Sequence, residues 1–501
     1  MAEYKTPGVY IKEKNAFGTS VVEAETAIPA FIGITEKAAN GNESLTGKPW
    51  KITSMTEFAT YFGGAPLADF KLGLGEDGKL AVSEPAVLFT LYYQMMMFYA
   101  NGGAACYVVS VGDYSKESPL TKAEVSAALT ALEKEQEVTM VVVPEAVFSP
   151  DYANILTDTL KHCGDAMKNR IAILDVQLTD AEGNAIAKPV EQFRNAVGSN
   201  YMSYGAAYYP WINASVLSDN DINPSAVALW DYDGDAPDLT AALGAGSALL
   251  TFFNSTFAVI KTKQAALAAN PADSALAQEL ATAKADLHNA LVMNWPEYKS
   301  AVKKIKDKLN LLPPSASIAG IFTAVDNNRG VWKAPANVSV SYANSPSETI
   351  NDYEQEDLNM PMNGKAVNAL RAFPGEGIKV WGARTLDGNS QDWRYVNVRR
   401  TLLFLEESVK NAARAYVFEP NDAGTWINMR CMIENFLRSV WKRGGLAGAT
   451  PEDAFEVHVG LGDTMTAEDI LEGMLRIRVL VAVSRPAEFI EITFQQQMQK
   501  S

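Results

Sequence analysis

The stretch that decides the fold is VTMVVV at residues 138–143, a run of β-branched and apolar residues that ends at Pro144. It begins a regular alternation of helix-like and strand-like segments at residues 150–165, 171–174, 190–197 and 204–209. Apolar strands that alternate with helices are typical of α/β units whose sheet is at least partly parallel. We therefore predict a mixed α/β fold.

Toward the N-terminus, residues 7–11 (PGVYI) and 27–34 (AIPAFIGI) are β-prone runs. No charged residue lies between Glu84 and Asp113, a length that exceeds that of a membrane-spanning helix. The Asn-Gly-Gly turn at 101–103 divides this stretch, so we predict a helix before the turn and a buried strand after it. The start of the chain lacks the apolar region of a secretory signal peptide.

Residues 239–312 are rich in alanine and other helix formers, and we interpret them as an inserted helical hairpin. An Asn-Pro pair at 270–271 interrupts the pattern, and Asp273 or Ser274 can cap the second helix. We expect the two prolines at 313–314 to stop this helical region.

The last third of the chain mixes both element types. We expect a loop at 343–361, a strand at 377–385, helices at 398–413 and 425–441, and strands at 477–483 and 488–494. In the final strand Ile490, Ile492 and Phe494 share one face, which is typical of a half-buried strand. Because a terminal strand needs a pairing partner, either its own sheet or a neighbouring copy has to supply one.

The composition is that of an acidic globular chain. It has 501 residues, of which 48% are hydrophobic and 20% charged, and its net charge is -16. At roughly 150 residues per domain, this length predicts about three domains. The acidity argues against nucleic acid as the main partner. Three widely spaced cysteines exclude a disulfide framework and a Cys-rich zinc site.

The sequence contains no recognisable catalytic motif. Neither a phosphate-binding glycine loop nor a G-x-S-x-G or H-E-x-x-H pattern occurs. Asp231, Asp233 and Asp235 have the spacing of part of a calcium loop, but Ala242 stands where the last glutamate ligand belongs. We therefore predict no catalytic residue, no bound cofactor and no metal site, and we interpret this acidic stretch as a surface turn.

One segment, residues 394–443, reverses the overall charge. Its basic residues are Arg394, Arg399, Arg400, Lys410, Arg414, Arg430, Arg438, Lys442 and Arg443, against five acidic residues. Two interpretations stay open. The basic side chains either pair with acidic groups of the same chain, or form a basic face that meets an acidic face of another copy or partner.

Motifs spread in order over nearly the whole chain resemble the contractile tail sheath family of phages, tailocins and related contractile injection systems. They are PGVYI at 7–11, NGG at 101–103, YYPW at 208–211, RGVWKAPAN at 329–337, VWGART at 380–385, FEPN at 418–421, GLAG at 445–448 and PAEF at 486–489. Each motif is weak alone, and the ordered set is specific. The alanine-rich segment lies outside these motifs.

The resemblance implies a multi-domain sheath fold whose conserved core is built from both chain ends. The expected parts are an N-terminal arm (1–25), the first part of the core (26–112), an α/β middle domain (113–238), the helical insertion (239–312), the C-terminal part of the core (313–485) and a C-terminal strand arm (486–501).

The implied function is structural and not enzymatic. Subunits of this family polymerise as a helical cylinder around an inner tube and contract to drive that tube through a target envelope. The implied partners are copies of the chain, the inner tube protein, and baseplate and cap or terminator proteins, without nucleic acid or direct membrane insertion. The implied location is the bacterial cytoplasm during assembly, and then a phage virion or an extracellular or anchored contractile particle.

The resemblance also implies two sets of contact residues. The arm strands that pair with neighbouring subunits would contain Pro7, Val9, Tyr10, Ile11, Phe489, Ile490, Ile492 and Phe494. The residues that face the tube would be Arg438, Lys442, Arg443, Glu452 and Asp453.

Two other functions remain alternatives from the sequence. A nucleotide-binding α/β metabolic enzyme would use the strand–helix units, but Pro144, Glu145 and Ala146 follow the strand at 138–143 in place of a glycine-rich turn. A static tube or shell protein would share the polymerisation and lack the contraction.

Overall fold

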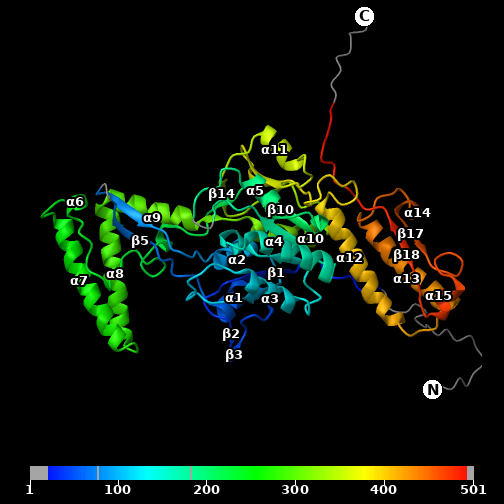
Figure 1. Cartoon of the computed structure of the whole chain (residues 1–501), viewed down its shortest axis with the longest axis horizontal. Coiled ribbons are helices and arrows are strands. Elements are labelled where there is room, and N and C mark those ends of the chain that lie inside the picture. Colours follow the sequence, from blue (N-terminus) through cyan, green and yellow to red (C-terminus); the bar gives the residue numbers. More distant parts are fainter. Residues whose placement is uncertain (1–20, 76–77, 181–182, 493–501) are drawn as a thin grey trace, which may run out of the picture.

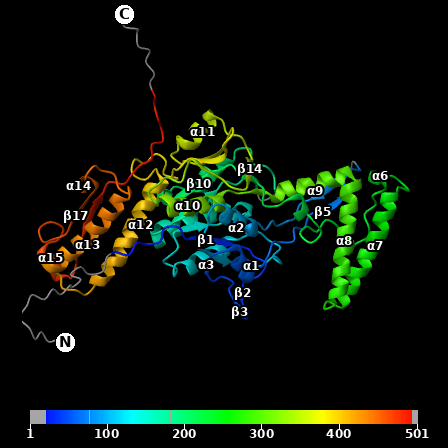
Figure 2. The same cartoon turned by 180° about the vertical axis from the view of Figure 1, so that it is seen from behind.

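The computed structural model describes residues 21–75, 78–180 and 183–492. The molecule is elongated, with a central α/β body between a helical lobe at one end and a C-terminal lobe at the other (Figure 1). The view from behind shows the same arrangement (Figure 2). The predicted mixed α/β fold is confirmed.

The central body is built on a mixed sheet. In the described part of the chain nine strands form it, in the order β13-β16-β15-β10-β9-β8-β1-β7-β4. The strands from β15 to β7 in this order run parallel to one another, and the strands at both edges are antiparallel. Their bounds are β1 (Pro29–Gly33), β4 (Trp50–Ile52), β7 (Cys106–Ser110), β8 (Met140–Val142), β9 (Ile171–Asp175), β10 (Gly205–Tyr209), β13 (Val338–Ser339), β15 (Asn368–Phe373) and β16 (Gly377–Trp381).

Helices cover both faces of this sheet, which is why the strands β1, β7, β8, β9 and β10 are buried along their whole length. Ala30 and Ile32 of β1 belong to one buried cluster and Phe31 to the other, because successive side chains of a strand point to opposite faces. The first cluster includes α3 (Lys122–Leu132), α4 (Tyr152–Lys161) and α5 (Pro189–Ala196), and the second includes α1 (Met55–Phe62), α2 (Leu91–Ala100) and α10 (Ser315–Arg329).

The strands expected in the first part of the core and in the middle domain lie in one sheet. β1 sits between β7 and β8, so residues on both sides of the expected boundary at 112–113 pair directly. The structure therefore differs from a division at that position. Strand order within a parallel sheet depends on crossover connections, which hydrophobic patterns do not reveal.

The helical lobe contains the predicted hairpin. It consists of α6 (Thr240–Leu243), α7 (Ala248–Ala269), α8 (Ser274–Asn294) and α9 (Pro296–Leu309), with β5 (Lys71–Leu74) and β6 (Leu80–Ser83) packed against them. The side chain of Asp273 accepts a hydrogen bond from the Leu276 amide and caps α8, as predicted. The prolines at 313–314 do not stop a helix: α9 already ends at Leu309, and Pro314 is the N-cap of α10.

The predicted loop at 343–361 contains regular structure. It includes β14 (Ala343–Pro346), which pairs with β11 (Ile212–Ala214), and α11 (Asp352–Asn359). Asn351 and Glu354 form a capping box at the start of α11. Leu358 is the buried residue of this helix, so its sequence carries almost no apolar periodicity, and that is why the helix was missed.

The C-terminal lobe packs two long helices against a small sheet. Its elements are α12 (Val396–Ala413), α13 (Ala423–Lys442), α14 (Pro451–Ala454), α15 (Ala467–Leu471), β17 (Phe455–His458) and β18 (Arg478–Val481). Both long helices were predicted. Phe404 of α12 and Ile433 of α13 belong to the buried cluster that joins these elements. Among the described residues no helix is both long and apolar enough to cross a membrane.

Candidate assembly interface

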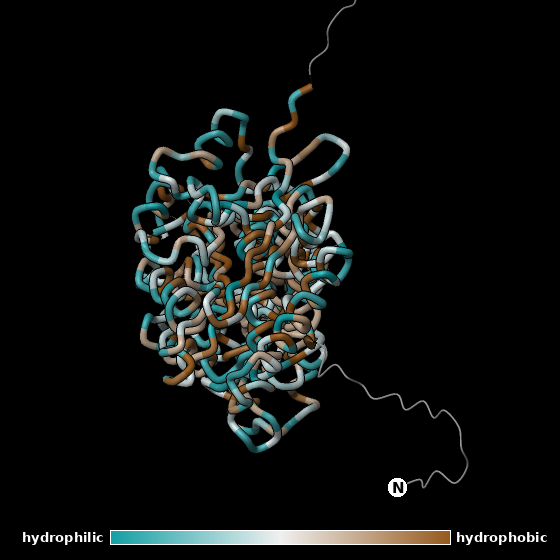
Figure 3. The backbone as a smooth tube through the Cα atoms, turned by 90° about the vertical axis from the view of Figure 1, so that its right-hand side faces the viewer, coloured by the Kyte–Doolittle hydropathy of each residue, from teal (hydrophilic) through white to brown (hydrophobic). Residues whose placement is uncertain are grey.

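The C-terminal segment leaves the body as an exposed apolar chain. Residues 484–492 form no strand in the described structure. The side chains of Phe489, Ile490 and Ile492 are 71%, 79% and 70% exposed. Figure 3 shows this hydrophobic stretch projecting away from the body. The described residues 484–492 therefore do not pair with the chain's own sheet, which was one of the two expected partners. Phe494 lies outside the described residues.

Glu488 fixes the point at which this segment leaves the body. Its carboxylate accepts hydrogen bonds from Arg384 Nε (2.9 Å) and Nη2 (2.6 Å), from Asn359 Nδ2 (2.8 Å) and from the Tyr395 hydroxyl (2.8 Å). Arg384 is almost completely buried and also donates to the backbone oxygens of Asn359 and Gly388. The apolar residues Phe489, Ile490 and Ile492 directly follow this bonded glutamate and are exposed.

The electrostatics favour this contact. Burial by itself would raise the pKa of Glu488, but the hydrogen bonds from Arg384, Asn359 and Tyr395 and the charge of Arg384 lower the pKa below its ordinary value. Glu488 therefore remains ionised at neutral pH.

The N-terminal segment is tied to the C-terminal lobe where its described part begins. The Ala24 amide donates to Ser408 Oγ of α12 at 2.9 Å, and Arg400 Nη2 donates to the Thr26 carbonyl at 2.9 Å. Glu23 forms an ion pair with Arg443. The arm residues Pro7, Val9, Tyr10 and Ile11 lie outside the described residues.

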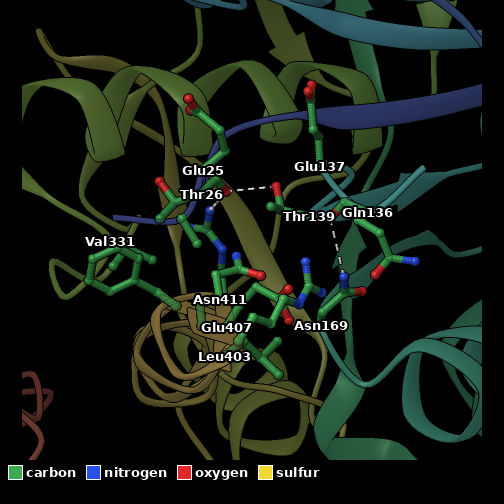
Figure 4. Close-up of a pocket in the computed structure, with 14 residues that line it drawn as sticks. Glu25, Thr26, Gln136, Glu137, Thr139, Asn169, Val331, Leu403, Glu407 and Asn411 are labelled. Carbon is green, nitrogen blue, oxygen red and sulfur yellow. Dashed lines mark hydrogen bonds between the residues drawn. The ribbon is translucent and has the colours of Figure 1, made fainter. Parts of the chain in front are cut away.

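A buried ion pair lies beside the contact between the N-terminal segment and α12. Arg400 donates to Asp326 of α10 through Nη1 (2.9 Å) and Nη2 (2.5 Å), and both side chains are less than 5% exposed. Burial raises the pKa of Asp326, and the charge and hydrogen bonds of Arg400 oppose that rise. A cavity of about 330 Å³ lies next to this pair, between Leu403 and Glu407 of α12 and the region of Asn169 (Figure 4).

Among the described residues, the small sheet of β17 and β18 pairs with no further strand. The two strands pair antiparallel from Phe455–Val481 to His458–Arg478, and in the described chain they form a sheet of two strands. A bridge between Leu446 and Val483 extends one end of it. An edge with unpaired backbone groups is a template for another strand. The four-residue run at β17 was too short to identify from the sequence, although its alternation of Phe455 and Val457 with polar residues is a weak strand signal.

Four of the nine basic residues of segment 394–443 form ion pairs within the chain. Arg430 pairs with Glu434, Lys410 with Glu407, Arg400 with Asp326 and Arg443 with Glu23. Arg399 stacks on the rings of Tyr204 (3.7 Å) and Trp393 (4.5 Å). Intramolecular pairing therefore accounts for these residues, whereas Arg438 and Lys442 are exposed at the C-terminal end of α13.

The five candidates for a tube contact lie on neighbouring elements. Arg438, Lys442 and Arg443 are at the end of α13, and the exposed Glu452 and Asp453 are on α14, which packs against α13. Asp453 also completes the capping box of Thr450. Arg443 is engaged by Glu23 and lies over the Trp332 ring at 5.2 Å, whereas Arg438 and Lys442 are exposed.

The described residues hold no cluster of histidine, cysteine and acidic side chains that could bind a metal ion. Asp231 and Asp233 lie in a turn beside the helical lobe, where Asp233 accepts a hydrogen bond from Gln264. This placement agrees with a surface turn.

Comparisons with known proteins agree on one family. Residues 247–386 match the phage tail sheath protein central domain, and residues 389–497 match the phage tail sheath C-terminal domain. The tail sheath protein of Vibrio phage KVP40 is 24% identical over 149 residues, which are 30% of this chain and 22% of that protein. The chain thus spans less than a quarter of the length of that relative.

Two solved structures resemble the whole chain. The contracted sheath complex of the extracellular contractile injection system PVC is 26% identical, with a TM-score of 0.59 over 99% of both chains. The contracted helical sheath of the anti-feeding prophage is 26% identical, with a TM-score of 0.59 over 99% of this chain and 100% of that one.

Proposed function

Because the chain belongs to the contractile tail sheath family, we propose that it is a sheath subunit that polymerises as a helical cylinder around an inner tube. Contraction of this cylinder drives the tube through a target envelope. The observation that carries the proposal is the exposed apolar segment at 489–492, anchored through Glu488 and aimed away from its own body.

The C-terminal arm pairs with a neighbouring subunit by strand addition. Its acceptor is the β17–β18 sheet, whose edges pair with no other described strand. Strand addition satisfies backbone groups on both chains, and side-chain pockets set the register. A contact between unlike surfaces does not close on itself, so repetition generates an open helical array. The N-terminal arm, which includes residues 7–11, adds a second strand to the same network.

Contraction needs no cofactor in this proposal. The energy is the difference between two packings of the same subunits and is stored when the sheath assembles in its extended form. The arms remain paired while the bodies rotate. A baseplate triggers the change, and cap or terminator proteins close the far end. The particle assembles in the bacterial cytoplasm and acts as part of a phage virion or of an extracellular or anchored machine.

The tube contact lies at the end of the C-terminal lobe. Arg438 and Lys442 supply exposed positive charge there, and Glu452 and Asp453 add negative charge within the same surface. Charged surfaces of this kind fix register and orientation, and their contribution falls with salt.

Deletion of residues 486–501 tests the arm assignment. We expect a soluble monomer, because the strand that joins neighbouring subunits is lost. Deletion of residues 495–501 alone is the matched control and should leave polymers intact. Long sheath-like polymers from the larger deletion would refute the assignment, and electron microscopy that finds a single sheath length and width would refute contraction.

A further inference from the structure

One helix, α12, holds the root of the C-terminal arm. The Tyr395 hydroxyl, at its N-cap, donates to Glu488 at 2.8 Å. Two residues further on, Asn397 Nδ2 donates to the Ser484 carbonyl at 3.0 Å. The beginning of α12 is therefore bonded to both ends of residues 484–488, from which the arm emerges.

The same helix also holds the root of the N-terminal arm. Arg400 donates to the Thr26 carbonyl, and Ser408 accepts from the Ala24 amide, both at 2.9 Å. The contacts with both roots lie between residues 395 and 408 of α12, a length of about 20 Å at 1.5 Å per residue.

The first turns of α12 are fixed to the central body. Arg400 forms the buried ion pair with Asp326, and Arg399 is held between the Tyr204 and Trp393 rings. Further along the helix, Leu403 and Glu407 line a cavity that Thr139 and Asn169 also line (Figure 4). The helix is therefore joined firmly to the body at one end and to the two arm roots along its length.

We propose that α12 is the anchor that joins the two arms within one subunit. Tension that enters through the C-terminal arm reaches α12 through the contacts of Tyr395 with Glu488 and of Asn397 with Ser484, and it leaves through the N-terminal arm. Arg384, the other main partner of Glu488, is bonded to Asn368 of β15, so the central sheet shares this load. This inference rests on the proposed function, because tension arises when neighbouring subunits hold both arms. The bonds of Glu488 to Arg384, Asn359 and Tyr395 act side by side, so they have to break together for the arm to come loose.

The substitution Glu488→Gln tests the anchor in assembled sheaths. It keeps the size of the side chain but places an amide NH₂ against donors from Arg384 and Tyr395. Glu356→Gln is the matched control, because Glu356 is exposed on the neighbouring helix α11. Since breaking a buried pair is costly, we expect extended sheaths of Glu488→Gln to fragment on triggering, with intact contracted sheaths reduced about tenfold. Intact contraction equal to that of Glu356→Gln would overturn the proposal.

A second measurement uses the full chain before it polymerises. Spin labels at Val22→Cys and Ala487→Cys, both exposed positions, report the distance between the two roots, in a background in which the partly exposed Cys431 is replaced by serine. We expect a narrow distance distribution that broadens with Glu488→Gln and not with Glu356→Gln. Equal widths would overturn the anchor even if Glu488→Gln forms no sheath. Failure of the unmodified chain to polymerise would instead refute the proposed function and leave this readout valid.

Discussion

Replacing the exposed apolar side chains of the C-terminal arm with serine should suppress polymerisation strongly. Phe489, Ile490 and Ile492 are 70–79% exposed, so about three quarters of each is available for burial in a neighbouring subunit. Full burial of one such side chain contributes about 1.5–3 kcal/mol. The three together therefore contribute about 5 kcal/mol per arm, which corresponds to a rise of roughly four orders of magnitude in the concentration needed for assembly.

The pattern of single substitutions adds a sharper expectation. Ile490 and Ile492 share one face of an added strand and Phe489 lies on the other. If the neighbour buries one face, Ile490→Ser and Ile492→Ser should have similar effects, and Phe489→Ser a different one.

Pelleting and light scattering over a range of subunit concentrations measure the effect, with electron microscopy to identify sheaths. The matched control is Met293→Ser with Val259→Ser, which removes exposed apolar side chains from the helical lobe, where they are 82% and 47% exposed. The reasoning is refuted if the arm variant polymerises at the concentration that suffices for the unmodified chain, or if the control loses assembly to the same degree.

Three further outcomes follow from the charged groups. Asp326→Asn leaves Arg400 buried without its counter-ion, so the free energy of unfolding should fall by about 3 kcal/mol, and an unchanged urea midpoint would contradict this. Burial raises the pKa of Asp175 to about 7, so the folded chain keeps a proton that the unfolded chain loses above about pH 4, and stability falls as pH rises through this window. Asp175→Asn does not titrate and should gain stability relative to the unmodified chain between pH 5 and 7, by up to about 1.4 kcal/mol per pH unit; a constant difference in urea unfolding would exclude this. Arg438→Glu combined with Lys442→Glu should weaken attachment to tubes at low salt and less at high salt, and unchanged sedimentation with tubes at every salt concentration would remove this contact.

Much of the fold could be predicted because its signals are local. The run at 138–143 is apolar on both faces, and the structure covers both faces of β8 with helices. The sequence also predicts the long helices α12 and α13 and the cap of α8 at Asp273. Each of these features depends on residues within one or two helical turns. The polar helix α11 could not be predicted. It begins with a capping box, but the helix that follows has almost no apolar periodicity.

The candidate site was predicted less completely. The alternation of Ile490 and Ile492 indicates a strand, and the family resemblance placed that strand in an arm. The contacts that hold the arm were not predicted, although Glu488 and Arg384 both lie in motifs that the sequence displays. Of the two interpretations of the basic segment, pairing within the chain holds for Arg400, Lys410, Arg430 and Arg443, and the basic face stays a prediction for the others.

The sequence by itself determined most of the buried strands and the long helices, and it determined that apolar and polar residues alternate at 490–494. Tertiary structure alone decided that Glu488 meets Arg384, 104 residues away, and that Ala24 meets Ser408, 384 residues away. The physical reason is that sequence patterns describe contacts between residues close together in the chain. A hydrophobic period describes one element and the face that it buries, whereas an ion pair between distant residues depends on how whole elements pack, and that packing is set by the sum of many contacts.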